Sequence, residues 1–342
     1  AQVAFRLKRL GHVVVHASDP VRLLCMGASG SSPPTGGPIG GFFEGTEKRI
    51  EVDFQVDLGS GVSLLTVNRQ EWEQVVKLSQ TELIGSKQTE NFNSFLLSES
   101  SLLVYPQKVI LKTCGRTVPL QSVEKILQIG KTNGMNPEWF CYSRKNFLKP
   151  SEQPEEHKSF ENEMMQCRKI SRDGGDAYTL GPMTGEHWLL YNTDFLEIDS
   201  KCRGDFTVDL MMYGLSADAR KHFYTDEPEG SRKGAEDMTN TSGLGALVAS
   251  IQGEVDDYCF SPCGYSCNIH AGQAYGIIHV TPEEECSYAS FETNFGSVML
   301  GLPKSSVAKA LNDLVGKVLD IFKPQRFTMT LFIDAGAEES IG

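Results

Sequence analysis

The strict alternation of apolar and polar residues in RIEVDFQVD (49–57) restricts the fold more than any other feature of the chain. Ile50, Val52 and Phe54 share one face, while Glu51 and Asp53 lie on the other. Strands of a buried parallel sheet are apolar on both faces, so half-polar strands favour antiparallel pairing. We expect further strands at 93–104, 108–115, 177–181, 188–195, 205–213, 275–280, 286–294 and 327–334, and helices at 68–81, 120–131, 216–224 and 304–322. The sequence therefore predicts an α+β fold with antiparallel sheets.

Composition narrows the class of protein. The chain has 342 residues, of which 40% are hydrophobic and 22% charged, enough for a sizeable core. Its net charge of -12 argues against nucleic acid and anionic membrane surfaces as partners. Nine cysteines without a C-x-x-C pair favour reduced thiols in the cytoplasm, and no apolar run reaches the ~18 residues of a membrane span.

The first 40 residues differ from the rest of the chain. The stretch GASGSSPPTGGPIGG (27–41) is rich in glycine, serine and proline and is typical of a flexible linker. We therefore expect residues 1–40 to form a flexible N-terminal extension, followed by a single domain over 41–342.

A polar interruption between two strand-like runs, LLSESSLLVY (96–105), suggests chemistry. It lacks the usual turn residues glycine, proline and asparagine. A polar edge or a loose turn would explain it, and so would a reactive serine. Ser100 and Cys114 fall on two expected strands joined by a short turn, so they could share a site. A buried structural thiol is the simpler explanation of Cys114 taken alone.

Four other segments carry polar residues in unusual places: FFEGTEKRIE (42–51), DFTVDLMMYG (205–214), FSPCGYSCN (260–268) and IIHVTPEEECSYASFETN (277–294). Each has an ordinary explanation, such as a charged turn, a hairpin loop or a structural histidine at His279. Acids on an inward sheet face would be costly unless they met a cation.

Taken together, the segments FFEGTEK, LSESS, LKTCG, YSRKNF, PCGYS and SYASFETN resemble the eukaryotic S-adenosylmethionine decarboxylases, pyruvoyl-dependent enzymes of polyamine synthesis. The likeness runs from about residue 42 to 334. It implies a four-layer αββα sandwich of two antiparallel β-sheets, with helices on the outer faces. The family continues for a further strand or two beyond this point, so we expect either a C-terminally incomplete chain or a fold that lacks an edge strand.

The resemblance implies that the Glu99–Ser100 bond cuts itself. The Ser100 hydroxyl would attack the carbonyl of Glu99 to form an ester, and β-elimination would leave a pyruvoyl group at residue 100. His279 matches the family's base for the elimination, and Ser266 matches a hydroxyl that assists processing.

The resemblance also implies the decarboxylation chemistry. The pyruvoyl group would form a Schiff base with S-adenosylmethionine and release CO₂, supplying the aminopropyl donor for spermidine and spermine, without a metal. Cys114 matches the proton donor. The remaining implied residues are Phe43, Glu99, Phe260 and Glu283 for substrate binding, and the active-centre acids Glu44 and Glu47.

A second acidic group matches the family's putrescine-activation site: Glu51, Lys112, Asp205, Thr207, Asp209 and Glu292. Three departures from the family's pattern count against activation by putrescine. Asp209 replaces a longer acid, Arg49 brings a built-in positive charge, and Cys141 replaces an aromatic residue.

Two other functions fit parts of the sequence. A catalytically weak or dead paralogue would act as the regulatory partner of an active decarboxylase, but such a protein loses catalytic residues that this chain keeps. A cysteine hydrolase built on Cys114 and His279 would leave LSESS unexplained. We expect S-adenosylmethionine as the substrate, putrescine as a candidate activator, and a homodimer or a regulatory paralogue as candidate protein partners.

Overall fold

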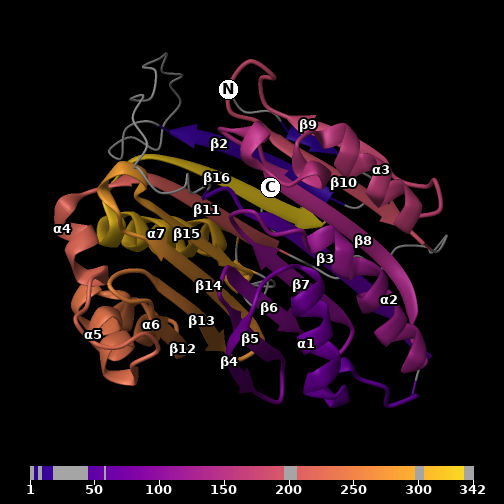
Figure 1. Ribbon diagram of the computed structural model, residues 1–342, viewed down its shortest axis with the longest axis horizontal. Coiled ribbons are helices and arrows are strands. Elements are labelled where there is room, and N and C mark those ends of the chain that lie inside the picture. Colours follow the sequence, from indigo (N-terminus) through magenta and orange to yellow (C-terminus); the bar gives the residue numbers. More distant parts are fainter. Residues whose placement is uncertain are drawn as a thin grey trace. The chain divides into compact units, whose positions relative to one another are not determined.

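Figure 1 shows the computed structural model, which describes residues 4–6, 10–17, 45–57, 59–195, 206–296 and 304–334. Contacts divide the chain into two compact units. The middle unit is Phe42–Asp199, and the two-segment unit combines Ala1–Gly41 with Ser200–Gly342. The single domain over 41–342 stays a prediction.

The described strands of the middle unit form an eight-stranded sheet in the order β4-β5-β6-β7-β3-β8-β10-β9, with every neighbouring pair antiparallel. The strands are β3 (Lys48–Gln55), β4 (Leu83–Gln88), β5 (Asn93–Leu97), β6 (Ser100–Val104), β7 (Lys108–Thr113), β8 (Asn136–Lys145), β9 (Asp176–Leu180) and β10 (Trp188–Asp194). β3 lies between β7 and β8, so its apolar residues contribute to one face of the sheet and its charged residues to the other.

Three helices pack on one face of this sheet: α1 (Arg69–Leu78), α2 (Val123–Thr132) and α3 (Phe160–Ile170). Asn68 and Ser159 cap α1 and α3 by accepting hydrogen bonds from backbone N–H groups of the first turn. The apolar side of β3 packs against the buried side chains of α1 and α2. Gly130 allows the closest approach, because a Cβ there would lie 2.0 Å from Cε1 of Phe54.

The opposite face of β3 is charged and nevertheless buried. Arg49, Glu51 and Asp53 are 6%, 7% and 7% exposed. Glu51 accepts ion pairs from Arg49 at 2.7 Å and from Lys108 at 2.6 Å. Burial would raise the Glu51 pKa, but these two cations outweigh it and hold the pKa below its usual value. Because the charges are paired, this polar face of the sheet can be buried.

The two-segment unit has a second antiparallel sheet, in the order β1-β2-β16-β11-β15-β14-β13-β12. Its strands are β1 (Ala4–Arg6), β2 (Leu10–Ala17), β11 (Phe206–Leu215), β12 (Glu254–Cys259), β13 (Tyr265–Ala271), β14 (Ala274–Thr281), β15 (Tyr288–Thr293) and β16 (Pro324–Asp334). Its helices are α4 (Ala217–Arg220), α5 (Arg232–Ser242), α6 (Leu244–Ser250) and α7 (Lys304–Phe322). Apolar residues of α5, α6 and α7 share one core with one face of the sheet.

The α+β class with two antiparallel sheets is confirmed, and face-to-face stacking of the sheets stays a prediction. The expected strands and helices are present, with boundaries shifted by a few residues. Part of the segment predicted to be a flexible extension, 10–17, is instead paired with β16 as strand β2. Within the described residues, no helix is long and apolar enough to cross a membrane.

Candidate active site

The polar interruption of the LSESS segment is a tight turn between β5 and β6. The Ser98 N–H donates to the carbonyl oxygen of Glu82 at 2.8 Å, and Ser98 Oγ accepts from the N–H of Glu82 at 3.0 Å. Ser98 Oγ also lies 3.0 Å from Thr81 Oγ1 and donates to the carboxylate of Glu99. These contacts fix the chain on the N-terminal side of the Glu99–Ser100 bond.

Ser100 holds a strained backbone conformation at the start of β6. Its φ of 124° lies in a region that residues with a side chain rarely adopt. Strain of this kind costs on the order of 1–3 kcal/mol and persists only where the surroundings enforce it. Here β6 is paired on both sides, with Leu97 and Thr113 opposite Ser100. The strain therefore falls at the residue that the sequence singled out.

The carbonyl oxygen of Glu99 accepts a hydrogen bond from the backbone N–H of Cys114 at 3.0 Å. Cys114 directly follows β7, and the Thr117 hydroxyl donates to its carbonyl oxygen at 2.8 Å. The Cys114 thiol is buried, and burial raises its pKa well above the usual value. The nearby carboxylates of Glu47 and Glu99 raise it further, while Lys48 opposes them. The thiol is thus protonated at neutral pH.

The Ser100 hydroxyl faces a buried ion pair. Its Oγ donates to Glu47 Oε1 at 3.3 Å, and Glu47 Oε2 lies 3.1 Å from Lys112 Nζ. The side chains of Glu47 and Lys112 are both 0% exposed, so this contact is shielded from water. Three sequence-predicted residues therefore meet at one point in the middle unit, and a carboxylate oxygen is within reach of the serine proton.

The two-segment unit holds the second group of predicted residues. Ser266 on β13 and His279 on β14 are register partners, and Ser266 Oγ lies 2.6 Å from His279 Nδ1. The ring of Phe260 approaches the His279 ring edge-on, with centroids 6.4 Å apart. Burial, followed by the carboxylate of Glu283, raises the pKa of Cys263 to about 11. Phe260 thus borders His279, and Glu283 lies near Cys263 within this unit.

The candidate putrescine residues are divided between the units. Asp209 on β11 is directly opposite Glu292 on β15, and Tyr275 donates its hydroxyl proton to Glu292 Oε1 at 2.5 Å. Thr207 lies two positions before Asp209 on the same strand. Glu51 and Lys112 belong to the middle unit, where each already has a charged partner. Phe43, Glu44 and Asp205 lie outside the described residues.

Sequence reasoning missed two features near the predicted site. The Cys114 N–H contact is a backbone interaction, which no residue type signals. Lys48 was also missed, although it is 0% exposed and its Nζ donates to the carbonyl oxygen of Gly115 at 2.8 Å. A lysine at an apolar position of the alternating β3 pattern was the available signal.

Comparisons with known proteins agree on one family. The family model described as adenosylmethionine decarboxylase matches residues 40–341. Three relatives bear the name S-adenosylmethionine decarboxylase proenzyme. The one from Dictyostelium discoideum is 37% identical over 306 residues, covering 86% of this chain and 76% of the relative. The one from Xenopus laevis is 34% identical (87% and 85% covered), and the one from Oryza sativa subsp. japonica is 33% identical (90% and 76% covered).

Proposed function

Because the chain belongs to the adenosylmethionine decarboxylase family, we propose that it is an S-adenosylmethionine decarboxylase, made as a proenzyme that cuts its own Glu99–Ser100 bond. The observation that carries this proposal is the strained Ser100, at the peptide bond whose carbonyl is held by the Cys114 N–H. A serine hydroxyl, a carboxylate acceptor and an oxyanion donor are the groups that an acyl shift needs.

In the proposed first step, Ser100 Oγ attacks the carbonyl carbon of Glu99. Glu47 Oε1, which accepts the hydroxyl hydrogen bond, takes the proton and returns it to the departing nitrogen. The Cys114 N–H stabilises the negative charge that develops on the carbonyl oxygen. The C–N bond then breaks and leaves an ester between Glu99 and the side chain of Ser100. The change also relieves the strain at Ser100.

In the proposed second step, His279 removes the α-proton of Ser100, and the bond between Cβ and Oγ of Ser100 breaks. The chain 1–99 departs with a new α-carboxylate at Glu99. The hydrogen bond between Ser266 and Nδ1 supports this role, because it orients the imidazole ring. The resulting dehydroalanine takes up water and releases ammonia, which leaves a pyruvoyl group at residue 100.

The residues around Ser100 suit a pyruvoyl group, because the site is buried and the neighbouring thiol is protonated. Once formed, the group supplies an electron-withdrawing carbonyl that binds the substrate amine and takes up the electrons released with CO₂. Cys114 serves as the proton donor. Phe43 and Phe260 bind the adenine and sulfonium through their ring faces, Glu283 binds the ribose hydroxyls, and Glu44 assists in the active centre. The product is the aminopropyl donor for spermidine and spermine.

The two other functions have less support. A hydrolase needs a thiolate, yet the Cys114 pKa is raised rather than lowered. A regulatory partner without activity would not need the contacts that Ser100 makes with Glu47, or those that Ser266 makes with His279. Three further points remain predictions for this chain: a partnership with an active paralogue, a homodimer and a cytoplasmic location.

The test of this function is release of CO₂ from S-adenosylmethionine labelled in its carboxyl group. Wild type should release it, and Ser100→Ala should release none because it cannot form the pyruvoyl group. Ser143→Ala serves as a control for serine loss in the same unit. Equal CO₂ release by wild type and Ser100→Ala would contradict the proposal.

A further inference from the structure

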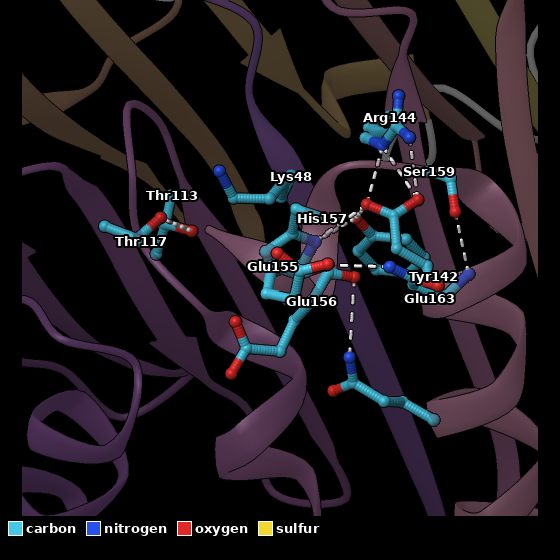
Figure 2. Close-up of polar contacts among 12 residues, drawn as sticks. Lys48, Thr113, Thr117, Tyr142, Arg144, Glu155, Glu156, His157, Ser159 and Glu163 are labelled. Carbon is cyan, nitrogen blue, oxygen red and sulfur yellow. Dashed lines mark hydrogen bonds and ion pairs between the residues drawn. The ribbon is translucent and has the colours of Figure 1, made fainter. Parts of the chain in front are cut away.

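A buried cluster on the helix-covered face of the middle sheet has no part in the chemistry proposed above. Tyr142, Arg144, His157 and Glu163 make up the Glu163 cluster, which Figure 2 shows in close-up. Glu163 Oε1 accepts from the Tyr142 hydroxyl at 2.7 Å and from His157 Nδ1 at 2.7 Å. Arg144 donates to both carboxylate oxygens at 2.8–2.9 Å. The cluster ties α3 and the turn before it to strand β8.

Lys48 connects the Glu163 cluster with the Cys114 turn. On β3, Lys48 is opposite Arg144 of β8 on one side and Thr113 of β7 on the other. Figure 2 likewise shows Lys48 between the cluster and the Thr113–Thr117 pair. Its ammonium donates to the carbonyl oxygen of Gly115 at 2.8 Å. The lysine therefore reaches from the cluster to the residue that follows Cys114.

Two buried cations lie near the ring of Phe147. The Lys48 ammonium lies 5.4 Å from the ring centroid, and the Arg144 guanidinium lies 4.0 Å from the same centroid. Arg144 donates to Glu163, whereas Lys48 donates to the Gly115 carbonyl. Glu163 neutralises Arg144, which allows both cations to stay buried.

We propose that Lys48, held in place by the Glu163 cluster, is a positioning residue for the Cys114–Gly115 turn. By holding the Gly115 carbonyl, it fixes the Cys114 N–H on the carbonyl oxygen of Glu99. Gly115 has a φ of 61°, which glycine adopts without steric cost, and the Lys48 ammonium and the Thr117 hydroxyl bind the two carbonyl groups of this turn. The link to catalysis rests on the proposed function, whereas the link to the turn does not.

Lys145 offers a matched control. It lies on the same sheet and is 2% exposed, but its ammonium pairs with Glu186 at 2.7 Å rather than with the Gly115 carbonyl. Lys48→Met and Lys145→Met each remove one buried ammonium and keep an unbranched side chain that is one atom shorter. Glu163→Gln and Glu186→Gln form the corresponding pair of acid variants.

The experiment measures amide hydrogen exchange in the peptide 108–118, with all variants in a Ser100→Ala chain that cannot cut itself. Loss of a hydrogen bond from a charged donor should speed exchange of the Cys114 amide at least about tenfold in Lys48→Met. Glu163→Gln should also speed exchange of the Cys114 amide. Lys145→Met and Glu186→Gln should leave this peptide unchanged. Equal exchange in Lys48→Met and Lys145→Met, or faster exchange spread evenly over the whole middle unit, would overturn the proposal.

The same variants with Ser100 restored report on self-cleavage, followed as loss of the intact chain with time. Lys48→Met should cut at least about tenfold more slowly than Lys145→Met, because the oxyanion donor is displaced. If exchange behaves as expected but wild type stays intact, the proposed function fails and the positioning role stands. If wild type cuts itself and Lys48→Met matches Lys145→Met in both measurements, the positioning role fails alone.

Discussion

Removal of the Lys112 ammonium should destabilise the middle unit strongly and should stop self-cleavage. Lys112 and Glu47 form an ion pair of 3.1 Å in which neither side chain is exposed. Truncating one partner of such a pair leaves a buried charge and costs about 3–5 kcal/mol. That is a large part of the roughly 5–15 kcal/mol that typically stabilises a folded domain. The same change removes the cation beside the Glu47 carboxylate, which is the group proposed to accept the proton of Ser100.

A double-mutant cycle separates the two effects. The variants are Lys112→Met, Glu47→Gln and the combination, each in a Ser100→Ala chain so that all species remain uncut. Tryptophan fluorescence during urea unfolding reports on the middle unit, because Trp72, Trp139 and Trp188, the three tryptophans of the chain, all lie in it.

The double variant should recover most of the free energy of unfolding that Lys112→Met loses, because it removes both charges of this pair. The coupling should be about 3 kcal/mol. With Ser100 restored, the double variant should still fail to cut itself, because the neutral amide introduced by Glu47→Gln cannot take the proton. A Lys112→Met loss below ~1 kcal/mol, or additive losses in the double variant, would refute the reasoning.

Single contacts lead to three further expected outcomes. Gly130→Ala should lower the free energy of unfolding by about 1–3 kcal/mol in urea titration, because its Cβ would overlap the Phe54 ring; unchanged stability would contradict the packing. The pKa of His157 is lowered, chiefly by burial. The contribution of His157 to the free energy of unfolding should therefore be fully present above about pH 6.5, and the free energy of unfolding should fall as the pH drops below that value. His157→Gln should lose this slope in urea titrations at several pH values, and an unchanged slope would assign it to other groups. Putrescine should speed self-cleavage less than about twofold, because Arg49 and Lys108 already neutralise Glu51, and an acceleration of about tenfold in a gel assay would contradict this.

The sequence predicted elements best where one face is apolar and the other charged. β3 is such a strand, and α7 has the apolar spacing of a helix. Several elements were missed: β4, β8, β12, β13, α3, α5 and α6. Residues 136–145 mix proline, aromatic and charged residues on a strand that is mostly buried on both faces, which removes the contrast that alternation needs. On β13, small polar residues and cysteine blur the same contrast, although Tyr265 and Ile269 do reach the core.

The site was predicted at the level of residues and only partly at the level of contacts. Ser100, Glu47 and Lys112 were chosen by resemblance, and they meet in the middle unit. The strained φ of Ser100 and the bond from the Cys114 N–H depend on how strands pair, which residue types do not encode.

The Glu163 cluster was missed for a related reason. Arg144 and Glu163 are 19 positions apart and belong to a strand and a helix that meet only in the folded chain. A strand with two consecutive basic residues and a helix that begins with acids look like solvated surface in the sequence. Their pairing appears only once the turn before α3 returns the chain to β8.

The most direct test of the central claim is the mass of the purified wild-type protein under denaturing conditions. We expect two chains, 1–99 and 100–342, the second of which reacts with a hydrazine because it begins with a ketone. Ser100→Ala should give one intact chain that does not react. An intact wild-type chain, or a chain 100–342 that begins with an ordinary amino group, would contradict the claim that Ser100 becomes the pyruvoyl group.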